Sequence, residues 1–582
     1  MLLKAVFWPI GSKTNGYCYG WDEPAVCVAG VIETDSRDEA ERVLYHSSPS
    51  LQSRWARLKL LGTSTVDRRN PFVPILDLEG VHEYYIVLYR RHLSKSLRFY
   101  SLDALKLDAS ENKRDPKATF VKKQLQHNFA APQAMFESGG ISHAVVEQLN
   151  VAGTIDQLLQ PRPHAFRMIT VWFQKVLSIA TAPFSPVLST IGRTLNVFCN
   201  IPISFSCRAL DLHYVVLKDI SATIQQLDVR AEQSVFLAAE VHSLGQRDES
   251  PLPMYSAQYI NFFNIVWLIL NDITIGYAFG SFLSENHRFL ADAICRYTEN
   301  ALIIWVQWVL RWLDSWPAGL KLNTELSWFY SYTFIDLVAM WGSVLNRIFL
   351  HLPIVIYVFG LISSFGGILG GMTMAISLFC DLLTVFTAHI YVCYVITNAV
   401  YARVLRTVGS LWNLFRGKRY NVLRNRTDSW EYDVDQLLFG TILFTLLAFL
   451  FPTVLVYYLL FALMRLGTIL IQASLETQLA FMNHFPLFAL MLRVKDPSRL
   501  PGGLYFSHNA SPTATGPILV LENQPLSLAT VFFQYTRLWA RLVSHYNPLR
   551  LLKCLLAGEF LSPIPRYEIR YNKIREKGSR AS

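Results

Sequence analysis

The chain has little charge and little cysteine. Only 16% of its 582 residues are charged, whereas ordinary soluble domains hold about 25%. This argues against a single soluble globule, which needs charge to cover its surface, and the apolar content argues against a disordered chain. The eight cysteines are scattered and form no C-x-x-C pair, so the sequence indicates neither a disulfide framework nor a zinc site.

Hydrophobic residues are what the chain has in excess. They make up 52% of the residues, and 53 basic residues outnumber 43 acidic ones to give a net charge of +10. The length allows about three or four domains. We therefore expect a mainly α, polytopic α-helical membrane protein with an N-terminal mixed α/β soluble domain, and a basic excess whose location has to be found.

The first 160 residues have the pattern of a soluble domain. Val26–Ile32 and Tyr84–Tyr89 are short runs of β-branched and aromatic residues, and Leu97–Leu102 alternates more loosely. Such runs, separated by polar stretches, predict strands. The apolar start is interrupted by Pro9 and is too short for a secretory signal, so we expect the N-terminus to remain in the cytosol.

Residues 161–255 read as an amphipathic helical linker region. Phe166–Ala182 mixes cations with apolar residues, and Leu210–Val241 is a long helix candidate. Apolar residues at helical spacing predict one buried face on the second segment, made by Leu210, Leu217, Ile220, Ile224 and Leu227. This helix either packs on the protein's own core, which we favour, or binds a partner.

Residues 256–492 contain the membrane-spanning candidates, since a spanning helix needs about 20 mostly apolar residues. We expect about four to six spans. The weakest candidate, which begins at Ile469, is a span, a re-entrant segment or an interfacial helix. Ala301–Trp316 is rich in Trp, which favours an interfacial helix. The span candidates are Ile260–Leu283, Leu326–Leu345, Ile348–Phe365, Met372–Tyr401, Leu437–Met464 and Ile469–Leu492.

The positions of the cations predict the topology. The connection between residues 402 and 435 carries seven cations, and the basic C-terminal region, residues 493–582, carries thirteen cations against five acids. Positive loops remain on the cytosolic side. With Ile469–Leu492 as a returning span, we expect this loop and both termini to be cytosolic, and amphipathic helices in the C-terminal region.

Three acids lie within predicted spans: Asp272, Asp336 and Asp381. Intramembrane acids are costly and often functional, so one interpretation is an ion or substrate path in a transporter or channel. The alternative is that each acid lies at a contact between helices, near a helix end or against a partner subunit. We favour the second interpretation because the sequence shows no internal repeat of the kind that transporters have.

Four glycines lie between two predicted spans: Gly366, Gly367, Gly370 and Gly371. Their small-xxx-small spacing allows another helix to approach closely. A turn is the competing interpretation, and we favour it because a single helix over residues 348–401 would be far too long for one crossing.

Two patterns are reminiscent of glycosyltransferases. Asp433-Val-Asp435 is an Asp-x-Asp sequence of the type that holds a metal on a nucleotide sugar, but it lies just before an apolar span, where acids favour the positive end of a helix. Glu232 and Glu240 have the spacing of a paired-glutamate motif, which also occurs by chance at Glu33 and Glu41. We assign no catalytic, metal-binding or cofactor-binding residue and expect no cofactor.

The basic segment between the last strong spans is a candidate surface for anionic lipid or an acidic partner. Juxtamembrane cations attract anionic lipid by about 1 kcal/mol each, and they also fix topology. Nucleic acid is an improbable ligand because no recognisable binding module accompanies these cations. The residues are Arg416, Lys418, Arg419, Tyr420, Arg424 and Arg426.

Two stretches then become specific for a family. They are LFRGKRYNVLRNRTDSWEYDVDQLLFGTILFT, starting at Leu414, and SPIPRYEIRY, starting at Ser562. Together they resemble the phosphatidylinositol N-acetylglucosaminyltransferase subunit Q (PIG-Q) family. The resemblance covers chiefly residues 260–582.

The resemblance implies a place in a multi-subunit complex of the endoplasmic reticulum membrane. That complex transfers N-acetylglucosamine from its UDP-sugar to phosphatidylinositol, the first step of glycosylphosphatidylinositol anchor synthesis. It implies a non-catalytic scaffold whose partners are the catalytic glycosyltransferase subunit, other small membrane subunits and the phosphatidylinositol-containing membrane. The family motif marks no catalytic residue that can be carried over.

Overall fold

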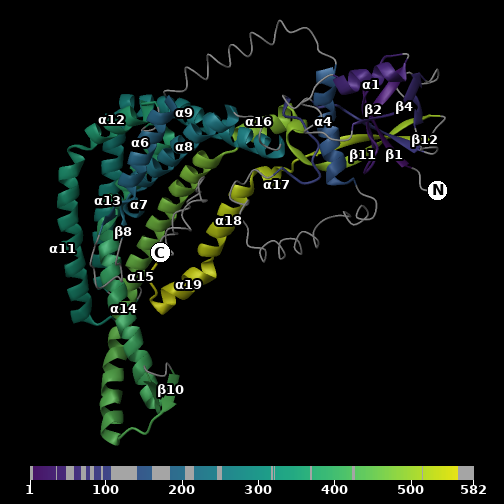
Figure 1. The fold of residues 1–582 in the computed structure, drawn as a ribbon. Helices are drawn as coiled ribbons and strands as arrows, with labels where there is room; N and C mark the ends of the chain where they lie inside the picture. The colour runs from purple at the N-terminus through teal and green to yellow at the C-terminus, as the bar shows by residue number, and fades with distance from the viewer. Residues whose placement is uncertain are drawn as a thin grey trace.

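The N-terminal strands form an eight-stranded mixed sheet (Figure 1). The computed structural model describes residues 4–34, 36–46, 58–66, 74–78, 84–92, 96–105, 141–159, 184–203, 215–245, 252–315, 319, 322–366, 370–421, 426–513 and 516–561. The strand order is β11-β12-β6-β1-β3-β2-β4-β5. The strands are β1 (Lys4–Pro9), β2 (Gly16–Trp21), β3 (Val26–Ile32), β4 (Lys59–Val66), β5 (Pro74–Leu78), β6 (Tyr84–Tyr89), β11 (Pro501–Thr513) and β12 (Gly516–Pro525).

The central strands are buried on both faces. One face packs against α4 (His143–Leu159), where Leu149 and Ile155 join a core with Tyr19 and Tyr89. The opposite face has its own apolar cluster around Trp8. Parallel strands covered on both sides read as continuous apolar runs, as β3 and β6 do. The predicted strands Val26–Ile32 and Tyr84–Tyr89 are therefore confirmed.

The prediction of a strand at Leu97–Leu102 is wrong. Leu97 has a positive φ of 55°, and the backbone of Tyr100 pairs with a side chain instead of with another strand. Its N–H donates to Oδ1 of Asn150 at 2.7 Å, and Nδ2 of Asn150 donates to its carbonyl at 2.9 Å. The amide of Asn150 on α4 thus replaces a strand partner.

The sheet also takes strands from the far end of the chain. β12 pairs in parallel with β6, with Ile518 opposite Ile86, and β11 pairs antiparallel with β12. Arg98 donates to Asp496 at 2.9 Å next to this connection. The predicted division at residue 160 therefore leaves out part of the domain, because residues 501–525 complete the sheet.

The helical body lies beside the sheet and runs away from it (Figure 1). Its first part contains α6 (Phe184–Cys199), α7 (Leu217–Ile220), α8 (Ala222–Gly245), α9 (Leu252–Thr298), the π-helical turn Glu299–Ile304 and α10 (Trp305–Asp314). Its second part contains α11 (Thr324–Phe349), α12 (Leu352–Ser364), α13 (Met372–Phe386), α14 (Ala388–Phe415), α15 (Val434–His484) and α16 (Leu487–Lys495), with a β9–β10 hairpin (Lys418–Asn421, Arg426–Ser429) between α14 and α15.

Three helices of the described chain are long and apolar enough to cross a membrane, and a fourth qualifies if the bent α11–α12 pair crosses once. This is at or below the lower end of the four to six expected. Ile260–Leu283 and Ala301–Trp316 were expected to be separate, but Leu252–Asp314 is one helical run. Met372–Tyr401 is instead divided at Thr387 into α13 and α14.

Of the three alternatives for Ile469–Leu492, a span, a re-entrant segment or an interfacial helix, the structure does not support a separate span that returns across the membrane. Residues 434–484 form one helix of 51 residues, about 75 Å long. Arg465 lies within it without breaking it, since its side chain is buried and lies over the ring of Tyr391 at 4.9 Å. The chain changes direction only after His484, where Pro486 precedes α16. One end of α15 therefore adjoins the β9–β10 hairpin, and the other approaches the sheet (Figure 1).

The linker region is part of the helical body where the structure describes it. Phe166–Ala182 lies outside the described residues. Within the predicted helix Leu210–Val241, Leu210 lies outside the described residues, and the part from Leu217 onward forms α7 and α8. α8 packs against α6, α9 and α13, which confirms packing on the protein's own core. The predicted apolar face is wrong, however. Ile220 is exposed and Ile224 only half-buried, whereas Gln226 and Arg230 are buried.

Candidate functional site: a buried polar junction

A polar face on α8 is the first component of the site. Gln226, Arg230 and Gln233 follow each other at intervals of four and three residues, and all are at least 97% buried. This spacing puts them on one side of the helix. Buried polar side chains persist only when they are hydrogen-bonded, so their partners show what this face does.

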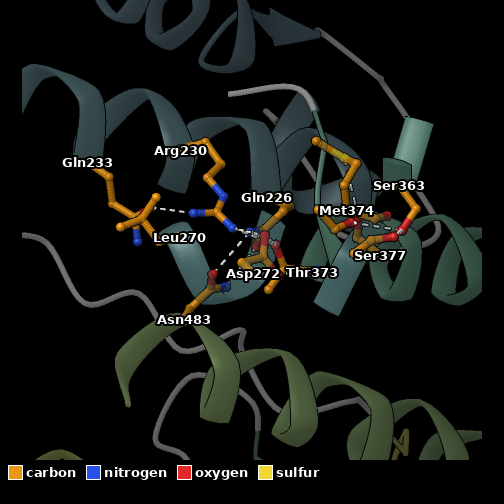
Figure 2. A network of polar contacts seen from close by, with 12 residues as sticks. Gln226, Arg230, Gln233, Leu270, Asp272, Ser363, Thr373, Met374, Ser377 and Asn483 are labelled. Atoms are coloured by element: carbon orange, nitrogen blue, oxygen red, sulfur yellow. Dashed lines mark hydrogen bonds and ion pairs between the residues drawn. The ribbon is translucent and has the colours of Figure 1, made fainter. Parts of the chain in front are cut away.

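Arg230 forms a buried ion pair with Asp272 of α9 (Figure 2). The same guanidinium donates to Oγ1 of Thr373 at 2.9 Å and to Oε1 of Gln233 at 3.0 Å. The carboxylate of Asp272 also accepts the backbone N–H and the hydroxyl of Thr373, each at 2.9 Å. Because Thr373 is in the first turn of α13, Asp272 caps that helix while it neutralises Arg230.

Gln226 extends the junction to α15. Its Nε2 donates to Oγ1 of Thr373 and to Oδ1 of Asn483, both at 3.0 Å, and Nδ2 of Asn483 donates back to Oε1 of Gln226 at 2.8 Å. The four helices α8, α9, α13 and α15 are thus held at one point (Figure 2). We call this set of five residues the polar junction: Gln226, Arg230, Asp272, Thr373 and Asn483.

Glycines allow the backbones to meet beside the polar junction. A side chain on Gly276 of α9 would lie 2.5 Å from the backbone of Gly371. Gly371 has a φ of +103°, a conformation that favours glycine, and it directly precedes α13. The hydroxyl of Ser363 donates to the carbonyl of Gly276 at 2.8 Å. This close packing brings Asp272 within reach of Thr373.

The predicted glycine segment separates two helices, which agrees with the turn that we favoured over a single long helix. α12 ends at Ser364 and α13 begins at Met372. Gly366 is exposed, Gly370 and Gly371 are buried, and Gly367 lies outside the described residues. The close helix–helix contact beside it is made by α9 and α12, where a side chain on Gly280 would meet the carbonyl of Gly360.

The three acids do not converge on one path. Asp272 belongs to the polar junction. Asp381 of α13 caps α8: it accepts the N–H groups of Ala222 and Thr223 at 2.7 and 3.1 Å, together with the hydroxyls of Ser221 and Thr223. Asp336 is exposed on α11. Asp272 and Asp381 therefore lie at the interhelical contacts that we favoured, and their oxygens are engaged in holding helices.

Neither glycosyltransferase-like pattern belongs to a cluster of three or more His, Cys, Asp or Glu side chains that could hold a metal ion among the described residues. Asp433 is at the N-cap position of α15 without a side-chain capping bond, and Asp435 is in its first turn; both are exposed. Glu232 and Glu240 are both on α8, about 12 Å apart along its axis.

The basic candidate residues occupy the β9–β10 hairpin and its entrance. Arg416 and Arg419 are exposed, and the guanidinium of Arg419 lies 5.0 Å from the ring centre of Trp430. Arg426 pairs with Asp428 at 2.8 Å. Lys418 is half-buried, and the backbone of Tyr420 is opposite Thr427. Arg424 lies outside the described residues. The hairpin thus collects these cations at one end of α14 and α15.

Sequence reasoning found Asp272 but missed its partners. Arg230, Gln226 and Asn483 were not singled out, because the apolar pattern of α8 drew attention to another face. The available signal was the polar series Gln226, Arg230 and Gln233 at helical spacing inside a helix that packs on apolar neighbours.

The fold and the polar junction define the class: a mainly helical protein with helices long and apolar enough to cross a membrane, in which Asp272 and Asp381 hold neighbouring helices together. Residues 224–502 match the family described as N-acetylglucosaminyl transferase component (Gpi1), a range that includes the whole polar junction. The chain belongs to the Gpi1 family.

Curated relatives extend the likeness beyond this range. The Schizosaccharomyces pombe N-acetylglucosaminyl-phosphatidylinositol biosynthetic protein gpi1 is 33% identical over 519 residues, which are 85% of this chain and 78% of the relative. The Saccharomyces cerevisiae phosphatidylinositol N-acetylglucosaminyltransferase subunit GPI1 is 32% identical over 64% of each chain. The mouse phosphatidylinositol N-acetylglucosaminyltransferase subunit Q is 35% identical over 47% of this chain and 46% of its own length. No solved structure matches the chain.

Proposed function

We propose that this chain is the assembly subunit of the complex that transfers N-acetylglucosamine to phosphatidylinositol in glycosylphosphatidylinositol anchor synthesis. The names of its relatives support the reaction. The polar junction supports the role within the complex, because its buried polar groups bond to one another across four helices. Such a network suits a rigid frame better than a reaction centre, where groups must be free for the substrate. Neither the family nor the relatives support the transporter alternative.

The proposed partners are the catalytic glycosyltransferase subunit and the smaller membrane subunits of the same complex. Large apolar side chains on the outside of the body, such as Leu350 on the α11–α12 bend and Phe439 on α15, are 76% and 69% exposed. Surfaces of this kind face lipid or other subunits. Asp336, on the exterior of α11, fits a contact with a partner better than contact with acyl chains.

The basic hairpin is the proposed surface for anionic headgroups or an acidic partner. Its candidate residues remain Arg416, Lys418, Arg419, Tyr420, Arg424 and Arg426. Arg419 stacked on Trp430 is a typical combination at a membrane surface, where Trp and Arg each keep one part in the apolar layer and one part in water.

We place the protein in the endoplasmic reticulum membrane, with the sheet and both termini on the cytosolic side. The continuity of α15 affects which side of the membrane the β9–β10 hairpin occupies. Because the hairpin adjoins one end of α15 and the sheet lies near the other, a complete crossing by α15 puts them on opposite sides. This differs from the expectation that the loop over residues 402–435 is cytosolic, which required a returning span that α15 does not contain.

Affinity purification in a mild detergent tests the assembly role. A tagged chain should recover the catalytic transferase subunit, and an Arg230→Leu variant should recover much less, because it leaves Asp272 buried without its cation. The matched control is Arg403→Leu on the exposed surface of α14. Recovery of the chain without a transferase subunit, or undiminished recovery with Arg230→Leu, would contradict the proposal.

A further inference from the structure

Two short helices near the C-terminal end carry apolar side chains that the described fold leaves uncovered. α18 (Phe533–His545) and α19 (Pro548–Ala557) follow the small helix α17 (Leu528–Val531), and neither α18 nor α19 has a buried residue. The uncovered side chains are Trp539, Val543, Leu549, Leu552 and Leu556, each more than half exposed. Leaving this much apolar surface in water is unfavourable.

The helices are nevertheless fixed in place. α19 is bounded by an N-cap at Asn547, whose Oδ1 accepts the N–H of Leu549 at 3.1 Å, and by Gly558 in the left-handed conformation. Its carbonyls at Leu555 and Leu556 accept the hydroxyls of Tyr458 and Tyr401, each at 3.0 Å. Leu551, Cys554 and Leu555 pack on the core. One face of α19 is thus held against α14 and α15, whereas Leu549, Leu552 and Leu556 on the other face are exposed.

Cations lie beside the outward apolar stripe. At helical spacing, Leu549, Leu552 and Leu556 share one strip of α19, and Arg550 and Lys553 share the adjacent strip. Both cations are exposed. The stretch from Asn523 to Gly558 contains four Lys or Arg residues and no acid. An apolar strip bordered by cations is typical of helices that lie in a membrane surface and attract anionic lipid.

The position of α19 along α15 is the one expected for a helix at a membrane surface. α19 bonds to Tyr458, and the β9–β10 hairpin adjoins the start of α15 (Figure 1). Between Leu437 and Tyr457 lie about 20 charge-free residues of α15, about 30 Å of helix. This is the thickness of the hydrocarbon layer of a bilayer. If the hairpin is at one surface, α19 is at the other.

We propose that α18 and α19 form an interfacial anchor that lies flat in an anionic lipid leaflet. Trp539, Val543 and the leucine strip of α19 enter the boundary between headgroups and acyl chains, while Arg550 and Lys553 contact phosphates. Charge complementarity selects anionic lipid over a protein partner, because Arg550 and Lys553 border the leucine strip of α19 and no acid lies between Asn523 and Gly558. This anchor is a separate function from assembly of the transferase and does not depend on it.

Depth-dependent quenching tests the anchor in the full chain. A fluorescent amino acid is placed at position 552, in the leucine strip, or at position 557, on the cationic side, and the protein is reconstituted into vesicles of phosphatidylcholine with phosphatidylinositol. Nitroxides on the acyl chains should quench the probe at 552 several-fold more than the probe at 557, and aqueous iodide should show the reverse order. Iodide quenching at 552 would overturn the proposal, and so would protection of 552 from both quenchers, which would mean that protein covers the strip.

The anionic preference has its own measurement. The variant with Arg550→Glu and Lys553→Glu should lose several-fold of the acyl-chain quenching at 552 in vesicles containing phosphatidylinositol, whereas Arg550→Lys should retain it. In the unaltered chain, quenching should be stronger with phosphatidylinositol than in phosphatidylcholine alone. Equal quenching in the two kinds of vesicle would overturn the assignment of these cations to anionic headgroups.

Discussion

At the residue scale, the pair of Arg230 and Asp272 illustrates how a buried charge constrains a helical body. Removing two charges from water costs several kcal/mol each, and their attraction compensates only when the remaining hydrogen-bonding positions are also used. Thr373 and Gln233 supply those extra bonds. The pair therefore contributes more to specifying which helices meet than to net stability.

The first prediction compares the removal of one charged partner of this pair with the removal of both. Arg230→Leu leaves an uncompensated carboxylate and should lower the free energy of unfolding by about 3–5 kcal/mol. The double variant with Arg230→Leu and Asp272→Leu should recover part of this loss because it buries no lone charge. Thermal unfolding of the purified chain in detergent measures both. A double variant less stable than Arg230→Leu would show that the pair itself is the main source of stability.

A second prediction concerns His92, which lies where the sheet meets the helical body. Burial, together with the charges of Arg98 and Arg90, lowers the pKa of His92 to about 4 from its ordinary value of 6.5. The unfolded chain takes up this proton at a higher pH than the folded chain, so stability falls as the pH drops from about 6.5 towards 4. His92→Gln should flatten this dependence, measured by unfolding at pH 7 and pH 5. His143→Gln, an exposed histidine of the same domain, is the control and should leave the slope unchanged.

Asp496, which pairs with Arg98 near His92, affects stability at a lower pH than His92 does. Its burial works to raise its pKa, but hydrogen bonds from Ser498 and Arg98 and the charges of Arg98 and Arg499 outweigh burial and lower it. A carboxyl group whose pKa is lower in the folded chain than in the unfolded chain stabilises the fold at pH values above its unfolded pKa. This stabilisation is lost as the pH falls through the folded pKa. The His92 effect therefore appears first on acidification and the Asp496 effect later.

At the element scale, α9 and α12 approach each other through glycine. A side chain on Gly280 would meet the carbonyl of Gly360 and the hydroxyl of Ser364, and one on Gly276 would meet the backbone of Gly371. Close approach of helix backbones lets dispersion and weak hydrogen bonds act between them. The position of Asp272, one turn before Gly276, depends on this contact.

The third prediction follows from that contact. Gly276→Ala and Gly280→Ala should each force the helices apart and destabilise the chain by about 1–3 kcal/mol, the usual cost of overpacking. Gly409→Ala on α14 and Gly467→Ala on α15 are matched controls, because nothing lies within 4 Å of a side chain there. These controls should be neutral or stabilising, since Ala favours helix over Gly. Thermal unfolding in detergent compares the four, and equal losses in all of them would contradict the close packing.

Sequence patterns predicted some of these elements well and others poorly, for physical reasons. β3 and β6 were predicted because strands buried on both faces are apolar throughout. Leu97–Leu102 was mistaken for a strand because its backbone partner is Asn150, distant in the sequence. Hydropathy identified the apolar residues of α15, but it cannot distinguish a helix that continues past Arg465 from one that returns. Arg230 was missed because its partners lie 42 and 143 residues away.

At the scale of the whole molecule, the sheet combines N-terminal strands with β11 and β12 from residues 501–525. Without β11 and β12, β6 becomes an edge with open backbone groups, and such edges promote aggregation. The apparent domain at residues 1–160 is thus incomplete on its own.

The fourth prediction tests this closure. A fragment of residues 1–160 should aggregate, whereas the same fragment joined to residues 501–525 by a flexible linker should be soluble and monomeric. Size-exclusion chromatography with light scattering distinguishes them. A monodisperse fragment of residues 1–160 would show that β12 is dispensable for the sheet.

The fifth prediction concerns the two ends of α15. A protease site inserted between residues 514 and 515 should be cleaved in sealed microsomes, because the sheet is proposed to face the cytosol. A site inserted in the β9–β10 hairpin should be cleaved only after detergent opens the vesicles. Cleavage of both sites without detergent would place the hairpin and the sheet on one side and would mean that α15 does not cross.

The central claim is that this chain assembles the transferase without performing the transfer. The most direct measurement is transfer of N-acetylglucosamine from its UDP-sugar to phosphatidylinositol in vesicles, by the purified chain alone and by the complex with and without the chain. We predict no transfer by the chain alone, transfer by the whole complex, and a large loss when the chain is omitted or carries Arg230→Leu. Transfer by the chain alone, or full activity of the other subunits without it, would contradict the account.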